Sequence, residues 1–128
     1  MADRRDEGKY WLARARNALS ASEALVSKEL FDDAISRAYY AMFYAAKALL
    51  IRDGVSAGPK HSAVVSAFGR EYAKKGKIEP RYHQMLIQDF EWRQKADYDV
   101  FWNADRETAQ GRIADAREFV SLVSKMFV

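Results

Sequence analysis

The residues from Trp92 to Tyr98, WRQKADY, place basic and aromatic side chains beside a carboxylate near the end of an expected helix. Arginine can form two hydrogen bonds with a phosphate, and Trp or Tyr rings can stack on a base. Asp97 could in addition orient the hydroxyl of Tyr98. The segment is therefore either a site for nucleotide or RNA, formed by Arg93, Asp97 and Tyr98, or a helix terminus with ordinary packing aromatics.

A second arginine, Arg37, lies within the most apolar stretch of the chain, residues 33–51. A buried guanidinium needs a carboxylate or several carbonyl groups as partners. Arg37 is thus either held in a structural ion pair, by Asp97 or another acid, or is a phosphate-binding group that lines a cleft. Tyr40 and Tyr44 share this stretch and are candidate ligand-binding residues with it.

The two histidines, His61 and His83, fall in separate expected helices, and His61 is the one we include among the candidate ligand-binding residues. The chain has no cysteine, which excludes disulfides, thiolate metal sites and cysteine nucleophiles. It also has no His-Glu-x-x-His motif, no calcium-loop spacing and no glycine-rich phosphate loop. We therefore expect no metal ion and no cofactor.

The segment from residue 60 to 81 is rich in positive charge. It holds Lys60, Arg70, Lys74, Lys75, Lys77 and Arg81 against Glu71 and Glu79. Such a segment is either a face that binds phosphates or an ordinary solvated surface.

Length and composition bound the remaining possibilities. A chain of 128 residues fits one domain, here residues 1–128, and can bury a real core. The net charge of +3 permits nucleic-acid or acidic partners without requiring them. The first eight residues, MADRRDEG, are polar and predict a flexible tail, and no apolar signal segment follows them. We expect a cytoplasmic protein that does not interact with a membrane.

Hydrophobic residues recur at three- and four-residue steps in five segments, and no strand pattern is present. The predicted helices cover residues 9–27, 33–51, 60–75, 80–96 and a last segment from about 105 to the C-terminus. The second is apolar nearly all round, so it should be the long central helix of an all-α bundle, buried on several sides. Asp32 or Asp33 could cap it, Gly54 could end it, and Asn103 or Asp105 could cap the last helix.

These segments together resemble the HEPN superfamily of helical domains. The resemblance covers nearly the whole chain. It rests on ALSASEALVS in the first helix, FDDAISRAYYAMFYAAKALL in the second, His61 at the start of the third, Arg93-x-x-Ala96-Asp97-Tyr98 in the fourth, and A-x-x-F-V from Ala116 to Val120 in the last. Within the superfamily the chain looks most like the small single-domain prokaryotic group.

The resemblance implies an up-and-down five-helix bundle, often a homodimer, that is commonly paired with a minimal nucleotidyltransferase as a toxin–antitoxin-like system. It also implies that a tyrosine near the motif, here Tyr98, is the group that such a partner adenylylates. Many members are metal-independent ribonucleases whose signature is Arg, four to six residues, then His. No arginine of this chain has a histidine at that spacing, and Arg93 is followed instead by Tyr98.

Three functions follow from the sequence. The first is a HEPN-type module that binds nucleotide or RNA and works with a minimal nucleotidyltransferase. The second is a metal-independent ribonuclease toxin with a variant active site, in which Arg93 and Tyr98 are the candidate catalytic residues and His61 approaches Arg93 in the folded bundle. The third is an interaction module whose helical surface only docks a partner.

Overall fold

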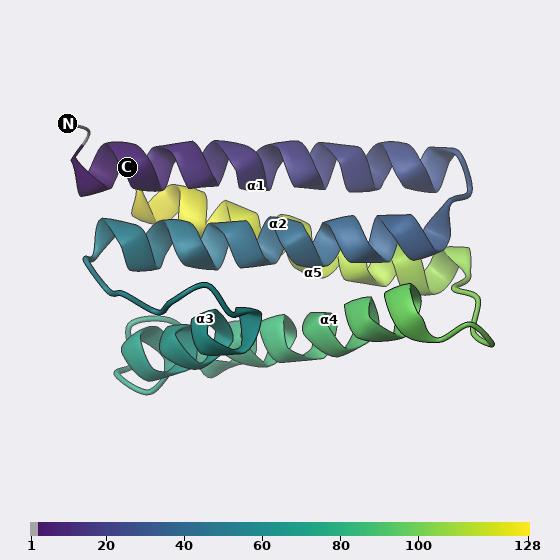
Figure 1. Ribbon diagram of the computed structural model, residues 1–128. Helices are drawn as coiled ribbons and strands as arrows, with labels where there is room; N and C mark the ends of the chain where they lie inside the picture. The colour runs from purple at the N-terminus through teal and green to yellow at the C-terminus, as the bar shows by residue number, and fades with distance from the viewer. Residues whose placement is uncertain (1–2) are drawn as a thin grey trace.

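The computed structural model describes residues 3–128, and every regular element in that range is helical (Figure 1). The α-helices are α1 (Arg4–Ser27), α2 (Phe31–Arg52), α3 (His61–Phe68), α4 (Pro80–Tyr98) and α5 (Arg106–Met126), and a π-helical turn, η1 (Gly69–Ala73), continues α3. The all-α, five-helix fold class predicted from the sequence is confirmed.

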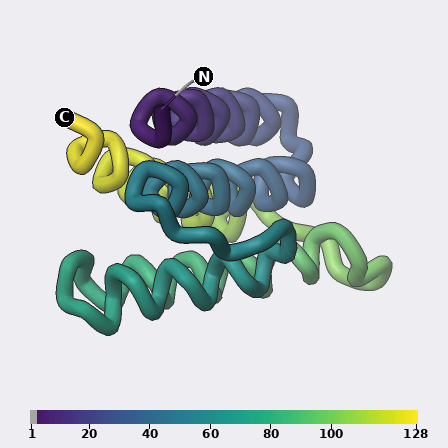
Figure 2. The backbone as a smooth tube through the Cα atoms, turned by 60° about the vertical axis from the view of Figure 1, so that its left-hand side comes forward, coloured from purple at the N-terminus to yellow at the C-terminus, as the bar shows by residue number. Residues whose placement is uncertain are grey.

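The second helix lies at the centre of the bundle. Twelve of the 22 residues of α2 are buried, and the helix contacts α1, α3, α4 and α5. In Figures 1 and 2, α1 covers one side of α2, α5 lies beside it, and α3 and α4 form a layer on the opposite side from α1. An apolar surface that continues around the helix is what allows neighbours on all these sides.

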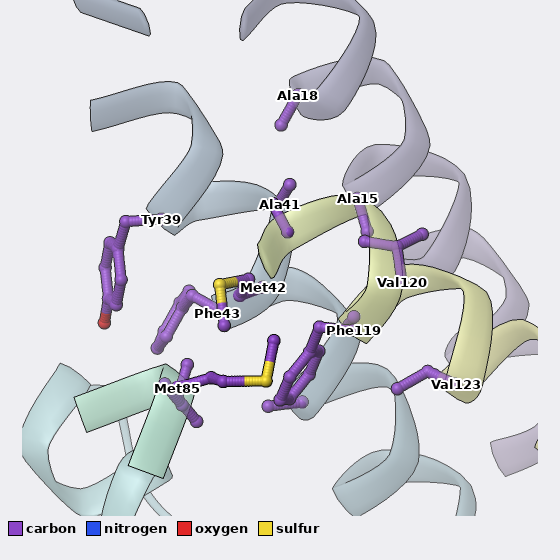
Figure 3. Packing of buried hydrophobic residues seen from close by; sticks show 14 of the residues in the cluster. Ala15, Ala18, Tyr39, Ala41, Met42, Phe43, Met85, Phe119, Val120 and Val123 are labelled. Carbon is purple, nitrogen blue, oxygen red and sulfur yellow. The ribbon is translucent and has the colours of Figure 1, made fainter. Parts of the chain in front are cut away.

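Small residues bring α1 and α2 close together. Ala15 and Ala18 of α1 are buried, and Ala18 faces Ala41 of α2 in Figure 3. Larger side chains fill the other side of α2, where Met42 and Phe119 of α5 are fully buried. Because α1 packs through alanines, the polar residues that flank its contact stripe lie close to the polar residues of α2.

The first helix begins earlier than predicted. Residues 4–8 are helical rather than a flexible tail, because the Asp3 carboxylate accepts a hydrogen bond of 2.8 Å from the Asp6 backbone N–H and caps the helix. Gly8 is buried, and its Cα faces the ring of Phe127 near the C-terminus. The first two residues of the expected tail lie outside the described residues.

The connection between α1 and α2 also differs from the prediction. Neither Asp32 nor Asp33 caps α2, whose N-cap is Leu30 without a side-chain hydrogen bond. Asp32 instead accepts a hydrogen bond of 2.9 Å from the backbone N–H of Ala104 and so ties the start of α2 to the segment before α5. The last helix is capped as expected, with Asp105 accepting from the Thr108 N–H at 2.8 Å.

The segment after α2 decides which residues of α3 meet the central helix. Gly54 adopts a φ of +71°, and the N–H of Val55 bonds to the Leu50 carbonyl at 2.8 Å, which ends α2 in a Schellman-type turn. The following residues run back along α2, so that His61, the first residue of α3, lies beside Tyr39 in the middle of that helix. This return places a histidine next to the central phenols.

Candidate functional site

Arg93 of α4 is held by groups from two helices. Its Nη2 donates a hydrogen bond of 3.0 Å to the hydroxyl of Tyr40 on α2, and its Nε lies 2.9 Å from Oδ2 of Asp97. The Nε–H is not aligned with Asp97, so this contact is an ion pair rather than a directed hydrogen bond. Ser36 adds a long hydrogen bond of 3.4 Å to the same carboxylate. Since only 15 % of the Arg93 side chain is exposed, its guanidinium is oriented before any ligand binds.

The structural ion pair considered for Arg37, with Asp97 as its partner, does not form. Asp97 pairs with Arg93, and Arg37 is exposed with its Cζ 6.0 Å from the ring centroid of Tyr40. Within residues 3–128 no carboxylate lies at ion-pair distance from Arg37. The core-facing side of α2 is taken by neighbours such as Ala38, and residue 37 therefore points to solvent. This geometry supports the alternative of a guanidinium that lines a cleft.

His61 reaches the same phenols from α3. Its ring stacks on Phe43, with centroids 4.0 Å apart and an interplanar angle of 8°, and its Nδ1 lies 3.0 Å from the hydroxyl of Tyr39. The edge of Tyr40 faces it with a centroid separation of 5.6 Å. Because Arg93 donates to Tyr40, the structure brings His61 and Arg93 to the same phenol without the sequence spacing of the family signature.

The protonation states around His61 follow from burial and nearby charge. Burial raises the pKa of Tyr39, so its hydroxyl keeps its proton and, with no other acceptor among the described residues, donates it to Nδ1 of His61. This bond places the ring proton of the neutral histidine on Nε2. Burial also lowers the pKa of His61, and the positive charges of Arg93 and Lys47 lower it further. At pH 7 the imidazole is therefore neutral.

Tyr98 ends α4 at the edge of this cluster. Its ring centroid lies 5.7 Å from Cζ of Arg93, and 70 % of the residue is exposed. Its hydroxyl has no hydrogen-bond partner in the part of the chain that the structure describes. Tyr98 is therefore an accessible aromatic ring and hydroxyl beside Arg93, and among the described residues no side chain is hydrogen-bonded to that hydroxyl to act as a base.

Two candidate residues, Arg37 and Tyr44, line a groove next to this cluster. Arg37 and Tyr44 of α2 face Tyr10, Arg14 and Asn17 of α1 across a groove of about 440 Å³. The groove is continuous with the first cluster, because the ring centroids of Tyr44 and Tyr40 are 5.7 Å apart. We call the first group, Tyr39, Tyr40, His61, Arg93 and Asp97, the Arg93 cluster, and the second the α1–α2 groove.

Four residues of these sites were not singled out from the sequence. Tyr39 lies in the apolar stretch of residues 33–51, and nothing in the sequence distinguishes a phenol that orients a histidine from one that only packs. Tyr10, Arg14 and Asn17 lie at intervals of four and three residues, which places them on one face of α1. That spacing could have identified them as a polar face before the structure was known.

Three of the six basic residues in the segment from residue 60 to 81 are held in ion pairs. Arg70 and Lys75 both pair with Glu71, at 3.0 and 2.8 Å, and Arg81 pairs with Glu118 at 2.6 Å. These pairs favour the solvated surface over a phosphate-binding face.

Two further properties of the described residues bear on the kind of site. Among residues 3–128, no three or more His, Asp or Glu side chains gather in a group that could hold a metal ion. Over the same range, none of the helices has the length and apolar character needed to cross a membrane.

Fold and site together define a small all-α domain in which an arginine of α4 and a histidine of α3 meet the phenols of the central helix. Residues 9–126 match the HEPN domain, and the chain belongs to this family. A UPF0332 protein of Thermotoga maritima is 35 % identical over 117 residues, covering 91 % of this chain and 88 % of the relative. Two proteins of Methanocaldococcus jannaschii, each named "Putative toxin", are 35 % identical over 123 residues and 32 % identical over 117 residues. The alignment with the first spans 96 % of this chain and 90 % of the relative. The alignment with the second spans 91 % of this chain and 79 % of the relative.

Proposed function

We propose that this HEPN-family chain binds nucleotide or RNA through the Arg93 cluster and acts with a minimal nucleotidyltransferase in a toxin–antitoxin-like pair. The observation that carries the proposal is the orientation of Arg93. Nη2 donates to Tyr40 and Nε lies at ion-pair distance from Asp97, whereas Nη1 has neither contact among residues 3–128. A guanidinium held in place with an unused N–H group is suited to a phosphate.

The chemistry of the neighbours supports a nucleotide as the ligand. Tyr98 offers an exposed ring on which a base can stack, and Tyr40 and the neutral His61 provide polar groups within the same cluster. The names of the two archaeal relatives support a toxin-like role.

The nucleotidyltransferase and the homodimer come from the family resemblance, and one feature of the surface supports an interaction there. Val100 and Phe101, directly after α4, are 85 % and 95 % exposed and adjoin the exposed Tyr98. Exposed apolar side chains beside a candidate site are typical of a docking surface. In this proposal the partner covers these residues and reaches the hydroxyl of Tyr98.

The test measures binding of labelled AMP and of a short single-stranded RNA to wild-type protein and to Arg93→Ala. We expect the variant to bind at least tenfold more weakly, because a charge-assisted hydrogen bond contributes about 1.5–3 kcal/mol. Lys95→Ala is the matched control: it removes one positive charge two residues away, from a side chain that lies over Trp102 instead. If Arg93→Ala loses helical content and melts early, or binds as well as wild type, Arg93 is not the ligand-binding group.

A second function, a metal-independent ribonuclease, is favoured by the position of His61. In the other tautomer, with the ring proton on Nδ1 and donated to the Tyr39 oxygen, His61 could take the proton of an RNA 2′-hydroxyl at Nε2 while arginine stabilises the charge on the phosphate. This function predicts cleavage of cellular RNA that persists in chelator and is lost in both His61→Asn and Arg93→Ala, whereas His83→Asn remains active. An intact RNA pool after incubation with folded wild-type protein would exclude it.

A further inference from the structure

The α1–α2 groove is a concave surface with polar and aromatic walls. Its volume of about 440 Å³ falls within the range of about 300–1,000 Å³ that small-molecule sites occupy. Arg14 and Asn17 come from α1, and Arg37 and Tyr44 come from α2. The groove exists because α1 and α2 pack through alanines, which leaves the longer side chains at the edge of their contact facing one another.

The charge of the groove is positive and uncompensated. Within residues 3–128, neither Arg14 nor Arg37 has a carboxylate at ion-pair distance. On the same bundle Arg106 pairs with Glu29 at 3.1 Å, so a carboxylate partner is available to a surface arginine elsewhere. Two neighbouring guanidiniums without an acid favour an anionic ligand.

The aromatic residues of the groove hold one arginine in place and leave one ring free. Cζ of Arg14 lies 5.0 Å from the ring centroids of both Trp11 and Tyr44, which fixes the guanidinium at the groove wall. Tyr10 lines the same groove and is 61 % exposed, so its ring can accept a stacked base. An oriented arginine beside an exposed ring suits the phosphate and base of a nucleotide.

The groove lies next to the Arg93 cluster. Cζ of Arg37 and Cζ of Arg93 are 6.0 and 5.3 Å from the ring centroid of the same residue, Tyr40, so the two guanidinium carbons are at most about 11 Å apart. Two guanidiniums this close, each reaching outward from its helix, can contact phosphates of the same strand. The two sites can therefore hold successive phosphates of one strand.

The geometry points to the α1–α2 groove as a second phosphate-binding subsite, in which Arg14 and Arg37 hold the backbone of a single-stranded RNA whose next phosphate lies at Arg93. This inference rests on the proposed function, because it extends the ligand of the Arg93 cluster. It also names the class of ligand: an oligoribonucleotide rather than a mononucleotide.

The experiment compares AMP with labelled single-stranded RNA of two, four and eight nucleotides, each titrated at several salt concentrations. The proteins are wild type, Arg14→Ala, Arg37→Ala and, as matched control, Arg16→Ala. Arg16 lies on α1 with Arg14 but points to Ser124 of α5, where its Nη2 donates a hydrogen bond of 3.1 Å. All four proteins are first compared by circular dichroism and thermal melting.

We expect wild type to bind RNA at least tenfold more tightly than AMP. Arg14→Ala and Arg37→Ala should each lose most of that gain while binding AMP as before, and Arg16→Ala should keep it. Each phosphate contact to a single strand contributes about 0.7 to the slope of log K against log salt, so each groove variant should reduce the slope by about that amount. A merely structural role for these arginines would not reduce it selectively.

Three results would overturn the subsite. Equal affinity of wild type for AMP and RNA would leave the Arg93 cluster as a mononucleotide site and remove the groove from the ligand. An unchanged salt slope in Arg14→Ala and Arg37→Ala, or an equal loss in Arg16→Ala, would show that the groove makes no specific phosphate contact. Failure of wild type to bind either AMP or RNA would reject the proposed function together with this inference.

Discussion

Replacement of His61 by phenylalanine should destabilise the domain by leaving a buried hydroxyl without an acceptor. Tyr39 is fully buried, and its only hydrogen-bond partner among residues 3–128 is Nδ1 of His61 at 3.0 Å. Phenylalanine preserves an aromatic ring against Phe43, which stacks on the imidazole at 4.0 Å, so the change removes the nitrogen and little packing.

The size of the effect depends on which partner is removed. An unsatisfied buried hydroxyl costs about 1–3 kcal/mol, and we expect His61→Phe to lower the free energy of unfolding by that amount. Tyr39→Phe leaves the imidazole nitrogen unpaired, but His61 is only partly buried and can be hydrated, so the expected loss is about 0.5–1.5 kcal/mol. The double variant should lose less than the sum of the two.

The free energy of unfolding of wild type, the two single variants and the double variant is measured by urea unfolding, followed by circular dichroism at pH 8, where His61 is neutral. A coupling energy between the two substitutions of about 1 kcal/mol is the expected result. In wild type, stability should also fall as the pH drops below about 6.5, because the folded protein holds the His61 pKa below its unfolded value and the unfolded chain takes up the proton first. Additive effects, or the same pH profile for His61→Phe and wild type, would refute the hydrogen bond and the environment derived for this histidine.

Three further predictions test separate parts of the structure. Asp97→Asn removes the negative charge that competes for Arg93, so phosphate affinity should rise severalfold in direct binding, and weaker binding would show that Asp97 is needed to orient the arginine. Asp89 is 1 % exposed and pairs with Arg112 at 2.6 Å, and burial raises the pKa of Asp89 to about 7. The stability of wild type should therefore fall as the pH rises from about 4 to 7, and Asp89→Asn should not show this fall in urea unfolding at those pH values. Gly8→Ala should destabilise the protein by about 1–3 kcal/mol, because the new Cβ would lie 2.9 Å from the ring of Phe127. Gly111→Ala is the control: its Cβ meets open space within a helix, and it should stabilise the protein by up to about 1 kcal/mol. Equal shifts in melting temperature for the two variants would contradict the close packing at residue 8.

The positions of the helices could be predicted because hydrophobic periodicity and local capping decide them. The central helix was identified by its apolar residues on all sides, and Asp105 and Gly54 act at the helix ends as their types suggest. The start of α1 could not be predicted in the same way. Its first turn looks like a polar tail in the sequence, and what orders it is the Asp3 cap and the contact of Gly8 with Phe127, a residue at the far end of the chain.

The site was predictable only where its residues are neighbours on one helix. Arg93 and Asp97 are four residues apart, and their pairing follows from helical geometry. The approach of His61 depends on the path of residues 53–60 back along α2, which no local pattern specifies. The sequence left Arg37 between an ion pair and a cleft-lining position, because a helix that is apolar on most sides does not reveal which narrow face remains exposed.

The central claim is that nucleotide or RNA binds at the Arg93 cluster, and proton NMR of the two histidines tests it most directly. The chain contains only His61 and His83, and the spectrum of His61→Phe assigns them. His83 serves as an internal control, since its Nε2 contacts the Val65 carbonyl at 3.1 Å in a different part of the bundle. On titration with a short single-stranded RNA, the His61 resonances should shift in a saturable way and its pKa should rise as phosphate enters, while His83 stays unchanged. Saturable RNA binding that leaves His61 unmoved, or that moves His83 instead, would contradict the account.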